Sequence, residues 1–120
     1  MQMLGLRGAT SADSNTGPAI LDATEELLKE LVAANDLVEA DIGALFFSVT
    51  NDLNAEFPAK AARVRLGWET TALMDCTEIP VPGAPEFVIR VLMLINTNKQ
   101  KKDLHYVYLK GATKLRTPSN

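Results

Sequence analysis

The segment from Phe87 to Ile95 holds one charged side chain, Arg90, among eight apolar residues. A run this apolar and this rich in β-branched residues predicts a strand buried in a sheet. Arginine stays protonated there, because its pKa lies above about 12, and burying a charge without a partner is strongly unfavourable. An anion must therefore face Arg90. It can be a carboxylate of the chain itself or an anionic ligand, and the residues alone favour the two about equally.

Length and charge restrict the class of protein. A chain of 120 residues with 47% hydrophobic and 22% charged residues is expected to form one globular domain. Its net charge of -3 provides no field that would concentrate a nucleic acid, so we expect no such partner. No apolar stretch approaches the roughly 20 residues that span a bilayer, and residues 1–7 do not resemble a signal peptide. We therefore expect no membrane partner and a cytoplasmic location.

Cys76 is the sole cysteine and His105 the sole histidine. One cysteine excludes an internal disulfide and a zinc site built from several cysteines. A serine or cysteine triad would need His105, at the start of an apolar strand, and the sequence contains no nucleophile elbow. We expect no metal and no cofactor, and we interpret His105 as a residue at the edge of a strand.

Hydrophobic spacing predicts seven elements and an α/β (α+β) domain. In the first strand Leu4 and Leu6 share one face, and Arg7 points to the other. The order β, α, β, α, β, β, β predicts a mixed sheet with two helices on one face. Residues 111–120 carry no strong pattern and would be a C-terminal tail of the single domain 1–120. The expected strands are 3–10, 42–50, 70–74, 87–96 and 105–109, the expected helices are 17–35 and 58–66, and the expected loop is 75–78.

Arginines supply the candidate binding chemistry. Arg7 and Arg90 both lie in expected strands, which points to a shared site facing inward. A guanidinium group matches a carboxylate with two parallel hydrogen bonds, so convergent arginines suit a small dianion or polycarboxylate. Lys60 and Arg63, three positions apart, share one face of the second helix. Glu78 precedes a proline-rich connection that would hold its carboxylate in place beside the strand ends.

Aromatic and large apolar residues are more ambiguous. Tyr106 and Tyr108 share one face of the last strand, and either hydroxyl could donate to a carboxylate. Phe57, just before a proline, is either a hydrophobic staple at a helix entry or the wall of a pocket. Leu73 and Met74 are most simply core residues.

Seven short segments, taken in order, resemble one known family. No single segment is decisive, but the ordered set is specific, and it resembles the monofunctional chorismate mutases of the AroH type from about residue 3 to residue 118. The segments are Leu6-Arg7-Gly8-Ala9-Thr10, Ser48 to Leu53, Phe57 to Arg63, Glu78, Ile89-Arg90-Val91, His105 to Leu109, and Leu115-Arg116.

The resemblance implies a homotrimer with a pseudo-α/β-barrel core and one active site in each cleft between adjacent subunits. Chorismate, a small dicarboxylate, would be rearranged there to prephenate, a step in the biosynthesis of phenylalanine and tyrosine. By the same resemblance Arg7 and Tyr108 hold a substrate carboxylate. Arg90 reaches the ether oxygen and a carboxylate, and Glu78 accepts a hydrogen bond from the ring hydroxyl.

The resemblance also assigns residues of the active site to the neighbouring subunit and to the C-terminal tail. Leu115 and Arg116 resemble the mobile tail that covers the site. Asp75 stands where some relatives have a cysteine near the substrate hydroxyl, and Cys76, one residue later, is given no role. The positions that resemble those of the neighbouring subunit are Phe57, Lys60, Arg63, Leu73 and Met74.

Two alternative functions remain at this point. A non-catalytic trimeric module that binds a small carboxylate metabolite would need Arg7 and Arg63. It would not require Arg90 and Glu78 to be positioned around a single bond of the ligand. An interaction scaffold with Arg90 in a structural ion pair is disfavoured, because Asp and Glu are scarce in the predicted strands. The rearrangement itself fits a chain without catalytic nucleophile or metal motifs, because it makes and breaks bonds within one molecule and needs mainly conformer selection and charge stabilisation.

Overall fold

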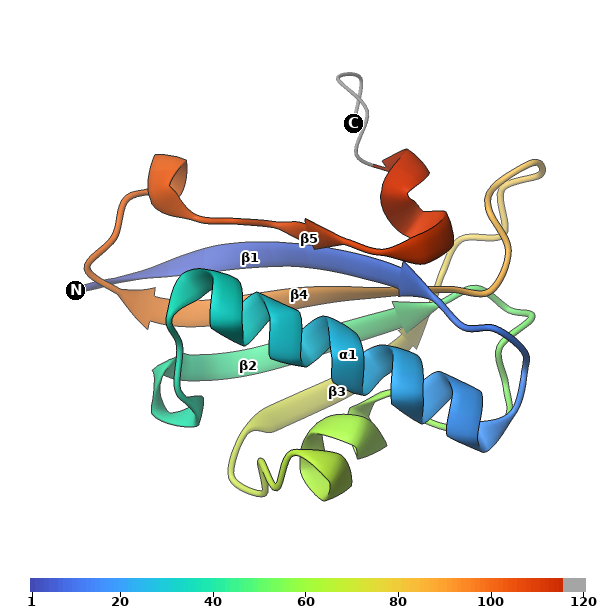
Figure 1. The fold of residues 1–120 in the computed structure, drawn as a ribbon, viewed down its shortest axis with the longest axis horizontal. Coiled ribbons are helices and arrows are strands. Elements are labelled where there is room, and N and C mark those ends of the chain that lie inside the picture. Colours follow the sequence, from blue (N-terminus) through green and yellow to red (C-terminus); the bar gives the residue numbers. More distant parts are fainter. Residues whose placement is uncertain (116–120) are drawn as a thin grey trace.

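The computed structural model describes residues 1–115 as a five-stranded mixed sheet with one long helix (Figure 1). The sheet order is β3-β2-β4-β1-β5. β1 and β2 are each antiparallel to β4, whereas β3 and β5 run parallel to β2 and β1. The elements are β1 (Gln2–Ser11), α1 (Gly17–Asn35), β2 (Ile42–Val49), β3 (Ala72–Thr77), β4 (Val88–Thr97) and β5 (Val107–Tyr108), with short helices η1 (Glu39–Asp41), η2 (Ala61–Arg65), η3 (Lys101–Asp103) and η4 (Lys110–Leu115).

Helix α1 begins and ends where the sequence predicts. The Thr16 hydroxyl accepts a hydrogen bond from the Ala19 backbone N–H at 3.3 Å, and Pro18 lies in the first turn, where it removes no helical hydrogen bond. The helix ends at Asn35, because Asp36 adopts the left-handed conformation with φ 54°. None of the helices in the described part of the chain is long and apolar enough to cross a bilayer.

The core lies between α1 and one face of the sheet (Figure 1). Gly8 allows the helix to come close to β1, because a Cβ atom at this position would lie 2.8 Å from Leu31 Cδ1. The η2 segment packs beside α1, so the helical elements cover one face, as predicted. The buried side chains of this core include Leu6, Leu45, Phe47, Val91 and Met93 from the strands and Leu27, Leu28 and Leu31 from α1.

The second helix is shorter and wider than the sequence predicts. Within the expected span 58–66, the η2 segment is a π-helical turn in which Leu66 N–H donates to the Ala61 carbonyl at 3.1 Å. The chain then leaves the helix at Gly67, whose φ of 72° suits glycine. Spacing of hydrophobic residues does not distinguish so short a turn from an α-helix.

Three strand boundaries also differ from the prediction. The expected loop 75–78 is wrong for its first three residues, because Asp75 to Thr77 pair with Phe47 to Val49 of β2 and extend β3. The fourth strand begins at Val88, since Phe87 has a left-handed backbone with φ 54°. The last strand is reduced to two residues, because only that part of it pairs with β1.

Within residues 1–115, neither α1 nor η2 covers the other face of the sheet, and this corrects the expectation that Arg90 is buried. Residues of β4 alternate, so Val91 and Met93 face the helix and Arg90 and Leu92 face away. The Arg90 side chain is 46% exposed and Leu92 is 42% exposed. Met74 of β3 is 53% exposed. This open face therefore presents an apolar surface that contains the guanidinium group of Arg90.

Candidate active site

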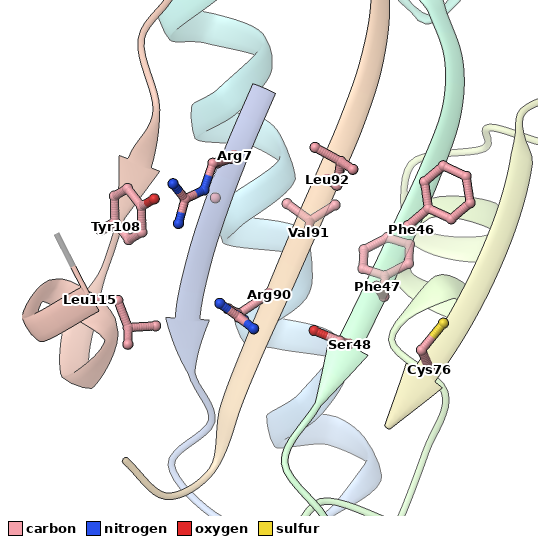
Figure 2. Close-up of a pocket in the computed structure, with 11 residues that line it drawn as sticks. Arg7, Phe46, Phe47, Ser48, Cys76, Arg90, Val91, Leu92, Tyr108 and Leu115 are labelled. Carbon is pink, nitrogen blue, oxygen red and sulfur yellow. The ribbon is translucent and has the colours of Figure 1, made fainter. Parts of the chain in front are cut away.

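A cavity of about 390 Å³ lies on the open face of the sheet (Figure 2). All five strands and η4 contribute to it, and two of its lining side chains are guanidinium groups. The apolar floor and the two cations suit a small anion with a hydrocarbon body. The lining residues are Arg7 and Gly8 of β1, Phe46, Phe47 and Ser48 of β2, Cys76 of β3, Arg90, Val91 and Leu92 of β4, Tyr108 of β5, and Leu115 of η4.

Strand register brings these side chains together. Ser48 of β2 lies opposite Arg90 of β4, and Leu92 lies between Phe46 on one side and Arg7 on the other. Directly paired residues of a sheet project to the same face. The side chains that point away from α1 therefore converge on the cavity.

Arg90 forms an ion pair with Glu78, which follows the end of β3. Its Nη2 donates to Glu78 Oε1 at 2.8 Å, and its Nε donates to Oε2. The Ser48 hydroxyl donates to the same Oε2, and the Glu78 side chain is only 15% exposed. Among the described residues, Glu78 thus engages two of the five N–H groups of the guanidinium. A carboxylate of the chain does face Arg90, behind the lining of the cavity and not in the core.

The hydrogen bond from Arg90 lowers the pKa of Glu78, although partial burial opposes it, and the Ser48 hydroxyl lowers this pKa further. In return, the hydrogen bond to Glu78 raises the pKa of Arg90. Both effects favour the charged forms. The cavity is therefore lined by a guanidinium group that a charged carboxylate orients near neutral pH.

Arg7 lies on β1 at the side of the cavity where β5 pairs. Its guanidinium lies over the Tyr106 ring, 5.9 Å from the ring centre. Such a cation–π contact orients the cation without neutralising it. Tyr108 lines the same cavity, and Figure 2 shows its ring beside Arg7. The predicted shared face of Tyr106 and Tyr108 is thus the side that carries Arg7.

Comparison with known proteins gives the family. The family model described as chorismate mutase type I matches residues 3–118. The chain belongs to this family. Chorismate mutases AroH from Thermus thermophilus and Bacillus subtilis (strain 168) are 42% identical over 113 residues and 34% identical over 116 residues. These matches cover 93% and 97% of this chain, and 92% and 91% of the relatives.

A solved chorismate mutase from Clostridium thermocellum has the same fold. Its TM-score is 0.91 at 50% sequence identity, and the match covers 92% of this chain and 98% of that one. Together with the family model, these similarities confirm the predicted membership in the chorismate mutase family and its isomerase function. The two alternative functions receive no support from them.

Several residues named by the resemblance to chorismate mutases do not line the cavity. Phe57 is 69% exposed, and Lys60 pairs with Glu56, the Nζ to Oε1 distance being 3.1 Å. Arg116 lies outside the described residues. Apart from Arg116, the residues that the structure does not bring into this cavity are Phe57, Lys60, Arg63, Leu73, Met74, Asp75 and Glu78, although Glu78 is bonded to Arg90, which lines it.

These residues lie on or near β3, at the opposite edge of the sheet from β5. Leu73 packs against the core under the helices, as its simplest interpretation predicted, whereas Met74 points to the open face. Asp75 accepts a hydrogen bond from the Ala59 backbone N–H at 3.0 Å, and its burial raises its pKa. In this chain, Asp75 therefore holds the η2 segment against β3.

Ser48, Phe46, Cys76 and Leu92 line the cavity but were not among the sequence-based candidates. A serine or phenylalanine in a strand gives no functional signal by itself. The alternation of side chains between the two faces of a strand was the available signal. It places Leu92 on the same face as Arg90, together with a residue from each neighbouring strand. Cys76 reaches the cavity because β3 is longer than predicted.

We expect the Glu78–Arg90 pair to make stability depend on pH in a defined direction. The folded-state pKa of Glu78 is lowered, so its contribution is present above the ordinary glutamate pKa of about 4.3 and is lost as the pH falls through the lower folded value. The melting temperature of the native chain should therefore exceed that of Glu78→Gln near neutral pH, and the gap should close as the pH falls below about 4. Thermal melts across this range measure it, with Glu30→Gln of α1 as the control; a gap that does not change with pH would contradict the expectation.

Proposed function

We propose that the chain rearranges chorismate to prephenate at the cavity on its open face, in a cytoplasmic homotrimer and without a cofactor. The observation that supports this most is the convergence of Arg7, Arg90 and Tyr108 on one cavity, with Glu78 bonded to Arg90. Two cations suit the two carboxylates of the substrate. The apolar floor suits its ring.

The rearrangement breaks a carbon–oxygen bond and forms a carbon–carbon bond within one molecule. Most of the barrier can be lowered by holding the compact conformer in which the two reacting carbons are close. Arg7 and Tyr108 would hold one carboxylate of the substrate for this purpose. The apolar side chains Phe46 and Leu92 restrict the space around the ring.

Arg90 would act on the bond that breaks. The ether oxygen becomes more negative as this bond stretches, so a guanidinium donor interacts with it more strongly in the transition state than in the ground state. Glu78 fixes the guanidinium before substrate binds, which avoids reorganisation during the reaction. Its carboxylate also favours the positive character that develops on the ring fragment.

The two edges of the sheet support the proposed trimer. Arg7 and Tyr108 lie toward β5, whereas Met74, Lys60 and Arg63 lie toward β3. One chain cannot bring its own two edges together, but a head-to-tail contact between copies can, and such contacts close into rings. The exposed Met74, Leu92 and Phe46 supply apolar area for this contact. A ring of three would complete three identical sites.

Replacing Arg7 with alanine should weaken substrate binding more than it slows the reaction. The carboxylate that Arg7 would hold keeps its charge throughout the rearrangement, so its interaction is nearly the same in the ground and transition states. A hydrogen bond to a charged group contributes about 1.5 to 3 kcal/mol, which corresponds to a KM increase of roughly tenfold to a hundredfold. Steady-state conversion of chorismate to prephenate measures both constants. A large fall in kcat at unchanged KM would contradict this role.

A further inference from the structure

The backbone is strained at the residue that precedes β4. Phe87 has φ 54°, in the left-handed region that non-glycine residues avoid. Its side chain is partly buried against the smaller apolar cluster around Ile20 and Ile89. Strain of this kind persists only where the surrounding structure holds it, and it is often found next to functional groups.

Asp52 holds the strained residue. Both oxygens of its carboxylate accept from the Phe87 backbone N–H, at 3.0 and 3.2 Å. On the other side of the same residue, the Phe87 carbonyl accepts from Ala12 N–H at 2.8 Å. Phe87 is thus bonded at both its N–H and its carbonyl, and within residues 1–115 the side chain that takes part is that of Asp52.

Thr50 connects this carboxylate to the first residue of β4. Its hydroxyl donates to Asp52 Oδ1 and accepts from the Val88 N–H at 3.0 Å. The Thr50 backbone N–H donates to the Val88 carbonyl at 3.1 Å. Together these bonds fix the position at which β4 starts to pair with the end of β2.

Glu78 and Arg90, the two charged residues of the proposed site, both lie close to these hydrogen bonds of Thr50 and Asp52. Glu78 is fixed by its N–H bond to Val49 at 2.8 Å, just before Thr50, and Arg90 lies three residues after Phe87. A one-residue change in the register of β4 would turn Arg90 to the helix side of the sheet. A smaller rotation at Phe87 would move its guanidinium away from Glu78 and the cavity.

We propose that Asp52 is a positioning residue for the rearrangement, because its carboxylate holds the left-handed backbone at Phe87 and so keeps Arg90 opposite Glu78. It does not line the 390 Å³ cavity, so it acts through Arg90 and not on the substrate. The inference rests on the proposed roles of Arg90 and Glu78.

The test compares three variants in steady-state kinetics. A misplacement of about 1 Å in a reacting group can cost about a hundredfold in rate, and we expect Asp52→Ala to lower kcat by about tenfold or more with a smaller change in KM. Asp52→Asn removes the charge but keeps an oxygen for Phe87 N–H and an amide for Thr50, so its kcat should stay within about threefold of native. Asp41→Ala is the matched control, since Asp41 Oδ2 accepts from the Val38 N–H at 3.0 Å at the far end of β2; it should leave kcat unchanged.

A spectroscopic measurement separates positioning from loss of stability. The Arg90 Nε–H donates to Glu78, and its resonance in a nitrogen–proton spectrum can be assigned from its absence in Arg90→Met. Asp52→Ala should speed its exchange with water severalfold, whereas Asp41→Ala should not. If Asp52→Ala does not fold, Thr50→Val, which removes only the connecting hydroxyl, is measured in its place with the same expected direction.

Three results would overturn the inference. They are a native kcat or a native Nε–H exchange rate in Asp52→Ala, an equal loss of kcat in Asp52→Asn, and an equal loss in Asp41→Ala. If Arg90→Met is strongly impaired while Asp52→Ala is not, this inference alone fails. A native kcat in Arg90→Met would overturn the proposed site roles and this inference together.

Discussion

Replacing Arg90 with methionine should lower kcat by on the order of a hundredfold or more, as the loss of a principal donor to a developing oxyanion does. The effect should fall on kcat much more than on KM, because the ether oxygen gains negative charge only as its bond to carbon stretches. Methionine keeps much of the length of the side chain and removes the charge and all the donors. Loss of activity would then report the electrostatic contribution and not a cavity in the fold.

The same change at Arg65 provides the control for Arg90→Met. Arg65 Nη1 bonds Asp22 at 2.8 Å and Glu25 at 2.9 Å on α1, away from the cavity. Arg65→Met should leave kcat unchanged, and chorismate turnover under saturating substrate measures both variants. A rise in KM with native kcat in Arg90→Met would mean that Arg90 only binds the substrate.

Two impaired variants should restore activity when they are mixed. If each site takes Arg90 from one chain and Arg63 from its neighbour, chains with Arg90→Met and chains with Arg63→Ala can together form native sites. With equal amounts and random assembly, Arg90 is native in half of the sites, and Arg63, which comes from the neighbouring chain, is also native in half of them. About a quarter of the sites in a closed ring therefore contain both native residues. Refolding the two variants together and assaying them at low chorismate concentration measures this recovery.

The matched control pairs Arg90→Met with Glu78→Ala. Arg90 and Glu78 are bonded to each other within one chain, so each site takes both from the same chain and no site of this mixture contains both native residues. This mixture should stay inactive. Light scattering of the native protein should give three times the chain mass of 13.0 kDa. No recovery in the first mixture would mean that each chain builds its site alone.

Local signals account for the parts of the fold that the sequence predicts well. The start of α1 at Thr16 and Pro18, and its end at Asn35, depend on capping within a few residues. β1, β2 and β4 are long and apolar enough to be recognised by their pattern. β3 was predicted too short, because the residues after Met74 become a strand only through pairing with β2.

The exposure of Arg90 shows what a strand pattern does not contain. Val91 and Leu92 are both apolar, yet one lies under α1 and the other lies on the open face. The apolar residues on both faces of β4 predict that both faces are buried. They do not predict whether the second face is covered by the same chain or by another copy. For the same reason, Arg7 and Arg90 were predictable as neighbours in one cavity, whereas the place of Ser48 there required the register of β2 against β4.

The position of β1 in the sheet has a consequence for how the chain is made. This N-terminal strand lies between β4 and β5, so Gln2 pairs with Thr97 and Gly8 pairs with Val107. Such distant pairings slow folding. At a synthesis rate of about 5 to 20 residues per second, β1 leaves the ribosome several seconds before its partners. During that time both its edges can pair with strands of other chains, so the growing chain should depend on molecular chaperones more than its small size suggests.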